Sequence, residues 1–220
     1  MLYHYELLNN HYVVDINGKK YLIDTGSHRS FPLNSNARKV AINGKEYPLQ
    51  TTPPMNIEKT TKLIGITPDG LIGTDILAKT SLTIYKNGTL EFKANKIDGR
   101  ELDIQSVYPL IVEGSSCGYN GSFIVDTGAK YGYGLHKVFK NKRPYEYVWD
   151  YNPGLGDLSS NIYHLEVSLG GETYPLDVCD NIKVEIGYLA PCASFMVGNI
   201  TTFFKEVVVF DFVRKKLILR

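Results

Sequence analysis

The stretch Tyr21–Ser30, YLIDTGSHRS, is an apolar run that ends at an aspartate, a threonine and a glycine. The chain does the same again in Phe123–Gly132, FIVDTGAKYG. Apolar and aromatic runs of this kind favour β-strands, and glycine lets the backbone turn sharply after the strand. Each stretch therefore predicts a buried strand ending in a turn with a carboxylate, which must be hydrogen-bonded or share a proton.

Pairs of turn residues between alternating apolar runs predict β-hairpins along the chain. Asn17-Gly18 and Asn43-Gly44 are typical of two-residue hairpin turns, and Gly170-Gly171 follows the same pattern. Two further stretches, 82–92 and 207–219, indicate strand pairs. We expect the last pair to join a sheet between the two halves of the chain.

Helical structure is indicated in only two short stretches. They are Gly73–Thr80, GTDILAKT, and Gly198–Glu206, GNITTFFKE. The composition includes sixteen tyrosines and twenty glycines, which suits strands and turns better than helices. The predicted fold class is therefore all-β.

Three elements recur in the same order in the two halves of the chain. The Asp-Thr-Gly triplet comes first, a hairpin ending in Tyr-Pro-Leu comes second, and two apolar residues followed by glycine come third. The matched stretches are Asp24–Gly26 with Asp126–Gly128, Val40–Leu49 with Val167–Leu176, and Leu71–Leu77 with Met196–Thr202. Repetition in register indicates a duplicated unit. We expect an N-terminal lobe of residues 1–100 and a C-terminal lobe of residues 101–220.

The two aspartates acquire a chemical role if the lobes pack about a pseudo-twofold axis. That symmetry would bring Asp24 and Asp126 face to face. Two carboxylates in contact cannot both ionise easily, so that one keeps a proton while the other does not. The pair then supplies a general acid and a general base, with a water molecule between them.

At these residues the chain resembles the aspartic peptidases of the pepsin and retropepsin group. DTGS at 24–27 is similar to the motif of a pepsin amino-terminal lobe, and DTGA at 126–129 is similar to the retroviral form. The hydrophobic-hydrophobic-Gly element of that family resembles 71–73 and 196–198. The resemblance covers most of the chain and implies a bilobal, pepsin-retropepsin-like fold with a cleft between the lobes. In length the chain is close to a fused retropepsin pair.

The resemblance implies that Asp24 and Asp126 form the catalytic pair of a hydrolase acting on peptide bonds. It also implies supporting residues in both loops, namely Thr25, Gly26, Ser27, Thr127, Gly128 and Ala129. The two threonines are expected to link the loops by mutual hydrogen bonds, and the Ser27 hydroxyl to contact the outer oxygen of Asp24. Ala129 has no hydroxyl for the same role, so the pair is expected to be asymmetric.

The resemblance also implies a flap, a mobile hairpin over the cleft. The interval between the triplet and the next hairpin is too short for a flap in the first lobe, but not in the second. We expect the flap in the second lobe, with a tip at Asn152–Gly156, whereas pepsin carries its flap on the amino-terminal lobe. The expected substrate contacts are Tyr147, Trp149, Tyr151, Gly154 and Gly156. The alternative is that this hairpin only covers the core of its own lobe.

The remaining composition excludes several classes of function. A net charge of +1 with 21% charged residues gives no electrostatic attraction to nucleic acid or membrane. Five histidines lack ligand spacing, so we expect no metal and no cofactor. Of the three cysteines, Cys179 and Cys192 are either free or paired.

The partner is expected to be a peptide or protein substrate, and both lobes in one chain make a monomer sufficient. The chain start lacks the pattern of a secretory signal, which favours the cytoplasm unless a signal has been removed. The alternative function is a catalytically silent peptide-binding or scaffold protein on the same fold.

Overall fold

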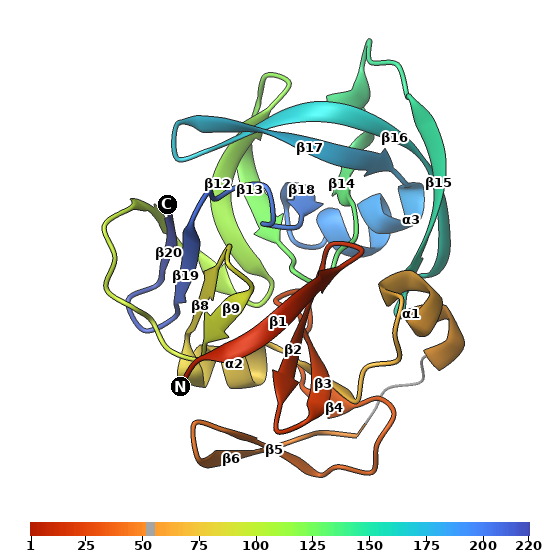
Figure 1. Ribbon diagram of the computed structural model, residues 1–220. Helices are drawn as coiled ribbons and strands as arrows, with labels where there is room; N and C mark the ends of the chain where they lie inside the picture. Colours follow the sequence, from red (N-terminus) through yellow and green to blue (C-terminus); the bar gives the residue numbers. More distant parts are fainter. Residues whose placement is uncertain (52–55) are drawn as a thin grey trace.

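The computed structural model describes residues 1–51 and 56–220, and within them most strands belong to two large sheets (Figure 1). In spatial order, the first sheet consists of β10 (Arg100–Asp103), β20 (Lys216–Leu219), β19 (Val207–Asp211), β8 (Leu82–Tyr85), β9 (Thr89–Glu91), β1 (Tyr3–Leu8), β2 (His11–Ile16), β3 (Lys19–Ile23), β7 (Gly70–Ile72) and β4 (Phe31–Pro32). The all-β prediction is confirmed.

The second sheet lies in the other half of the molecule. Its order is β11 (Ser106–Val107), β12 (Leu110–Ser116), β13 (Tyr119–Val125), β18 (Ser194–Gly198), β14 (Gly132–Gly134), β17 (Glu172–Asp180), β16 (Gly156–Leu169) and β15 (Glu146–Asn152). A separate hairpin is formed by β5 (Lys39–Ile42) and β6 (Lys45–Pro48). The α-helices are α1 (Ile57–Ile64), α2 (Thr74–Thr80) and α3 (Ile182–Val184); a 3-10 turn covers His136–Phe139, and a π-helical turn covers Glu185–Leu189.

The predicted hairpins form with the predicted turns. Asn17 and Gly18, at φ of 55° and 78°, connect β2 to β3, and Gly170 and Gly171, at φ of 59° and 86°, connect β16 to β17. Left-handed backbone at both central residues gives a turn whose twist matches the flanking strands. The register of each hairpin therefore follows from its turn residues.

The internal repeat has a direct structural counterpart. In the first half β7 lies between β3, which is parallel to it, and β4, which is antiparallel. In the second half β18 lies in the same way between parallel β13 and antiparallel β14. Each Asp-Thr-Gly triplet follows the parallel neighbour, so the same three-stranded unit holds both triplets.

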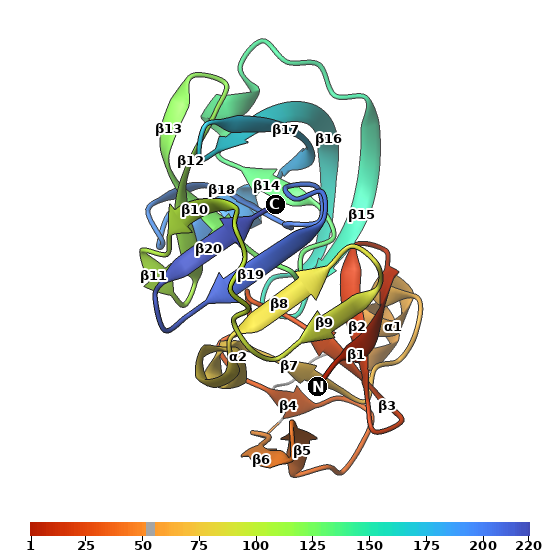
Figure 2. The same cartoon turned by 60° about the vertical axis from the view of Figure 1, so that its left-hand side comes forward.

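The last two strands lie in the first sheet (Figure 2). They are β19 and β20, which insert between β8 of the first half and β10 at the boundary of the halves. The C-terminal strands therefore complete a sheet whose other members belong to residues 3–103. The division into lobes at residue 100 stays a prediction.

The helices were predicted less well than the strands. The stretch Gly73–Thr80 forms α2 as expected, but Gly198–Glu206 forms turns and bends instead of a helix. α1 was not predicted, although Asn56 caps it by accepting the Lys59 N–H at 2.9 Å and Gly65 ends it at φ 97°. No helix among the described residues is long and apolar enough to cross a membrane.

The interior joins both halves. Its largest cluster combines buried residues of the first half, such as Ile23 and Leu77, with buried residues of the second, such as Phe123 and Phe210. Cys117, Cys179 and Cys192 are all free thiols, so a Cys179–Cys192 bridge is not formed.

Candidate active site

The two Asp-Thr-Gly loops are held at the ends of equivalent strands. β3 leads into Asp24, whose N–H donates to the carbonyl of Ile72 in β7 at 3.0 Å. β13 leads into Asp126, whose N–H donates to the carbonyl of Gly198 in β18 at 2.9 Å. Each aspartate is thus fixed by the parallel strand pair of its own half.

Hydrogen bonds between the two threonines link the loops. The N–H of Thr25 donates to Oγ1 of Thr127 and the N–H of Thr127 donates to Oγ1 of Thr25, each at 3.0 Å. Each hydroxyl in turn donates to a backbone carbonyl of the opposite half at 2.8 Å, Thr25 to Val125 and Thr127 to Ile23. Both threonines are 0% exposed. This closed set of buried bonds determines how the loops lie relative to each other.

The two loops lie so close together that only glycine fits at positions 26 and 128. A Cβ atom on Gly26 would lie 2.3 Å from Cγ of Asp126, and a Cβ atom on Gly128 would lie 2.5 Å from Cγ of Asp24. Both distances are shorter than any non-bonded contact between such atoms. Each carboxyl group therefore lies directly over the glycine of the opposite loop, which brings Asp24 and Asp126 together.

The local environment raises the pKa of both carboxyl groups. Oδ1 of Asp24 accepts the N–H groups of Gly26 and Ser27 at 2.9 and 3.0 Å, and Oδ1 of Asp126 accepts that of Gly128 at 2.9 Å. These bonds favour the ionised form, but loss of hydration outweighs them and raises the pKa of both groups above 3.8. The charge of Asp126 raises the pKa of Asp24 further.

The Ser27 hydroxyl does not make the hydrogen bond that the motif predicted. It donates to the carbonyl of Arg29 at 2.9 Å, and only the backbone N–H of Ser27 reaches Asp24. The expected bond from the Ser27 hydroxyl to Asp24 is therefore wrong, because the turn after the triplet points that hydroxyl back to its own loop. Ala129 follows in the second loop, and it lines a cavity together with Asp126.

A cavity of about 980 Å³ opens above the aspartates. Both carboxyl groups line it, together with residues of both loops and of α1. One wall is formed by a buried apolar cluster of the first half that includes Leu22, Phe31 and Leu71. A volume of this size is typical of ligand-binding clefts. The predicted cleft between the halves is therefore present.

The hairpin of β15 and β16 reaches into this cavity with its tip. The strands pair from Glu146↔Ile162 to Asn152↔Gly156, and Tyr151, Asn152, Pro153, Gly154 and Leu155 line the cavity. The same hairpin also packs on its own half, since Leu158 and Ile162 of β16 belong to a buried cluster there. The hairpin therefore both lines the cleft and packs on the core of its own half, and its role as a mobile flap stays a prediction.

Three of the expected substrate contacts lie elsewhere. Tyr147, Trp149 and Gly156 are absent from the lining of the cavity, and Tyr147 is 68% exposed on the outer surface. Side chains alternate along a strand, but the hairpin approaches the aspartates with its tip rather than with its flank. Tyr151 and Gly154 are therefore the members of the predicted set that face the cleft.

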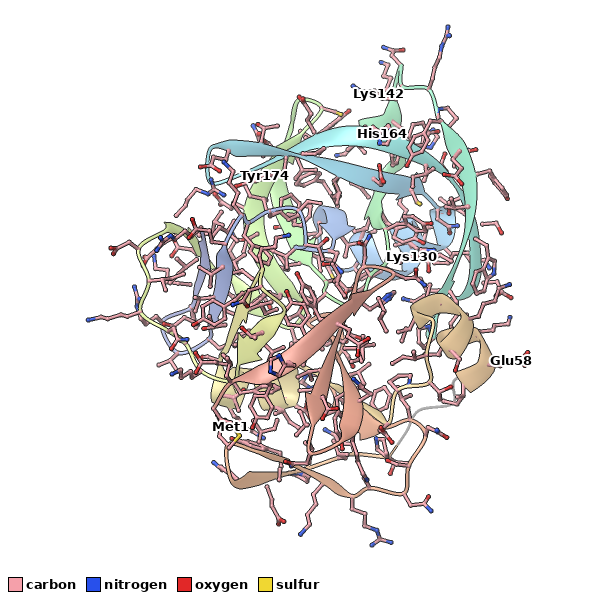
Figure 3. The ribbon with its side chains drawn as sticks, viewed as in Figure 1. Met1, Glu58, Lys130, Lys142, His164 and Tyr174 are labelled. Carbon is pink, nitrogen blue, oxygen red and sulfur yellow. The ribbon has the colours of Figure 1, made fainter. Side chains whose placement is uncertain are left out.

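The helix α1 of the first half holds the hairpin near its tip (Figure 1). The N–H of Asn56 donates to the hydroxyl of Tyr151 at 3.0 Å. Nζ of Lys62 lies 4.5 Å from the ring centroid of Trp149, and Lys59 forms an ion pair with Asp157. In Figure 3 the exposed Glu58 marks the outward side of this helix. These contacts form a latch between the halves.

We expect the double substitution Lys59→Ala/Lys62→Ala to loosen this latch. Surface ion pairs and cation–π contacts contribute little to global stability, so the unfolding temperature should hardly change. Amide hydrogen exchange in residues 146–162 should become faster. The control is Lys39→Ala, which removes an ion pair with Glu46 in the separate β5–β6 hairpin. Equal exchange in the double variant and the control would contradict the latch.

Several residues of the cavity carry no sequence signal. His11, Tyr133, Asp150 and Tyr188 line it, although none lies in a motif. The hydroxyl of Tyr133 donates to Oδ2 of Asp150 at 2.6 Å, while Nε2 of His11 is buried without a partner. Burial raises the pKa of Asp150 and lowers that of His11. Only the tertiary fold brings these groups to the cleft.

Comparison with known proteins identifies the fold. No family model and no curated protein matches the sequence. Among solved structures, the aspartic proteinase from Irpex lacteus is 13% identical, with 99% of this chain and 96% of that chain covered and a TM-score of 0.57. The Simian foamy virus (mac) protease is 15% identical over 41% of this chain and 88% of its own, with a TM-score of 0.32. The likeness to the Irpex lacteus enzyme, which extends over both halves, shows that this chain has the bilobal pepsin/retropepsin-like fold.

Proposed function

We propose that the protein is an aspartic endopeptidase that hydrolyses peptide bonds with a water molecule activated between Asp24 and Asp126. The observation that carries the proposal is the geometry of the pair. Each carboxyl lies over the glycine of the opposite loop, and buried threonine bonds hold the loops in that relation. The likeness of the whole chain to an aspartic proteinase supports it.

The proposed reaction uses the two carboxyl groups in opposite protonation states. One carboxyl group of the pair holds a proton and the other is ionised, because burial raises the pKa of both groups and they lie in contact. The ionised carboxyl removes a proton from the water as the water oxygen attacks the peptide carbonyl carbon, while the protonated carboxyl gives its proton to the carbonyl oxygen. As the resulting tetrahedral diol collapses, the carboxyl that gave its proton takes back a hydroxyl proton, and the other carboxyl delivers its proton to the leaving nitrogen. The C–N bond then breaks and the pair returns to its starting state.

The walls of the cavity favour an extended peptide with apolar side chains next to the cleaved bond. Leu22, Phe31 and Leu71 form the wall on the side of the first half, and Leu155 and Val197 contribute on the other side. The hairpin tip offers backbone groups with which an extended substrate can pair. Both aspartates belong to one chain, so the proposed active form is a monomer.

The test is cleavage of a diverse library of unstructured peptides from acidic to alkaline pH, with products identified by mass spectrometry. Because the active pair holds one proton and its pKa values are raised, cleavage should persist above pH 3.8. It should be lost as the pH rises through the raised pKa of the pair, since the general acid then disappears. Cut sites should have apolar residues on both sides of the bond.

A folded protein that cuts no peptide at any pH would overturn the proposal. If this inactive protein still bound peptides, and Asp126→Asn left the affinity unchanged, the result would support the alternative function of a catalytically silent peptide-binding protein. Cleavage that increased steadily towards alkaline pH would also contradict the proposed reaction, because a fully ionised pair has no proton to give to the carbonyl oxygen.

A further inference from the structure

Tyr188 reaches the cavity from an unusual element of the second half. It lies in the π-helical turn Glu185–Leu189, where the N–H of Ala190 donates to the carbonyl of Glu185 at 2.9 Å. The turn follows α3, where the side chain of Asn181 accepts the N–H of Lys183. Single π-helical turns are rare and occur frequently at functional sites. Tyr188 lines the same cavity as the two aspartates.

The hydroxyl of Tyr188 is buried without a hydrogen-bond partner. Among the described residues, only Nε2 of His11 and Nε of Arg100 share this condition. A buried polar group without a partner loses its hydration and gains nothing in return, and native structures contain few such groups. The hydroxyl of Tyr188 therefore has no protein partner and is free to donate to a group that enters the cleft.

The charges around this hydroxyl indicate its chemical state. Burial raises the pKa of the Tyr188 phenol, and the carboxyl groups of Asp126 and Asp24 raise it further. The geometry agrees with this effect, because Tyr188 and both aspartates line one cavity. The hydroxyl consequently keeps its proton at neutral pH and is available as a donor.

We propose that Tyr188 is a further catalytic residue, whose hydroxyl donates a hydrogen bond to the carbonyl oxygen of the peptide bond as that carbon becomes tetrahedral. This inference rests on the proposed function. The oxygen gains electron density when water attacks the carbon, and it takes its proton from the protonated carboxyl of the pair. Tyr188 stabilises the developing charge without releasing its own proton. Preorganised donors at such an oxygen commonly give the largest single contribution to catalysis.

The test compares Tyr188→Phe with the parent protein in steady-state hydrolysis of a peptide from the library. Loss of one such donor should lower kcat by about 10²-fold, with KM changed by less than about threefold, because the bond strengthens only in the transition state. The unfolding temperature should stay the same or rise, since the hydroxyl has no partner in the free protein. Tyr119→Phe, a change on β13 away from the cavity, is the matched control. An unchanged kcat, or a fall in kcat that follows a fall in unfolding temperature, would overturn the proposal.

A second measurement separates this inference from the proposed function. The probe is a peptide in which a secondary alcohol replaces the cleaved amide, so that its tetrahedral centre resembles the transition state. Calorimetry should show at least about tenfold weaker binding of this probe to Tyr188→Phe than to the parent, whereas the KM of the corresponding amide peptide should change by less than about threefold. If the parent hydrolyses nothing but this difference is found, the proposed function fails and the contact made by Tyr188 stands. Equal binding of the alcohol probe to both proteins overturns the inference.

Discussion

Replacing Asp24 or Asp126 with asparagine is expected to abolish peptide hydrolysis while the fold remains intact. Each substitution removes either the general base or the general acid of the pair, and positioned proton transfer contributes about 10²- to 10⁴-fold to a reaction rate. We expect a loss of at least about 10³-fold in kcat/KM, because neither carboxyl can take both roles. The measurement is cleavage of the best library peptide by parent, Asp24→Asn and Asp126→Asn at the pH of maximal activity.

The same substitutions are expected to stabilise the folded protein at neutral pH. The pKa of both carboxyl groups is raised in the folded state, so the stability that the pair contributes is present below pH 3.8 and is lost as the pH rises through the raised values. Asparagine carries no charge at any pH, so the variants do not lose this stability as the pH rises. The unfolding temperature of Asp24→Asn should therefore exceed that of the parent at neutral pH, with a smaller difference in acid.

The control for both measurements is Asp98→Asn, which changes an exposed carboxylate outside the cavity. It should leave hydrolysis and the unfolding temperature as they are in the parent. Cleavage that survived in Asp24→Asn and in Asp126→Asn at the parental rate would contradict the paired mechanism. A lower unfolding temperature of the two variants at neutral pH would contradict the raised pKa values.

The parts of the fold that depend on local sequence could be predicted, since short signals decide them. An Asn-Gly or Gly-Gly pair between alternating apolar runs favours left-handed backbone, so Asn17-Gly18 and Gly170-Gly171 predicted hairpins that the structure contains. The repeated triplets at Asp24 and Asp126 likewise predicted two equivalent loops. The helix α1 was missed although it carries an N-cap and a terminal glycine, because strand and turn signals dominate its surroundings.

The parts of the site that depend on tertiary placement could not be predicted. Nothing near Tyr188 in the sequence indicates that a π-helical turn carries its ring to the aspartates. The hairpin expected around Tyr147 is present as β15 and β16, but strand periodicity does not say which end of a hairpin enters the cleft. For Ser27 the motif predicted the right loop and the wrong hydroxyl partner, since that partner depends on the following turn.

Thr127→Val is expected to destabilise the protein by about 3 kcal/mol, because two buried hydrogen bonds lose a partner at once. Valine has nearly the shape of threonine, so the packing is kept while the hydroxyl is removed. The N–H of Thr25 then lacks its acceptor and the carbonyl of Ile23 lacks its donor, both in the fully buried contact between the halves. Each unsatisfied buried group costs about 1–3 kcal/mol. Urea unfolding followed by fluorescence measures the difference.

The bonds between Thr25 and Thr127 are mutual, so the two substitutions should not be additive. Once Thr127→Val has broken the hydrogen bonds between the loops, adding Thr25→Val should lower the free energy of unfolding clearly less than it does in the parent. The matched control is Thr173→Val on the exposed part of β17, which should change stability by no more than about 0.5 kcal/mol. If Thr127→Val were as mild as this control, or if the two losses simply added, the linked threonines would not hold the loops together. Other contacts would then have to hold Asp24 and Asp126 face to face.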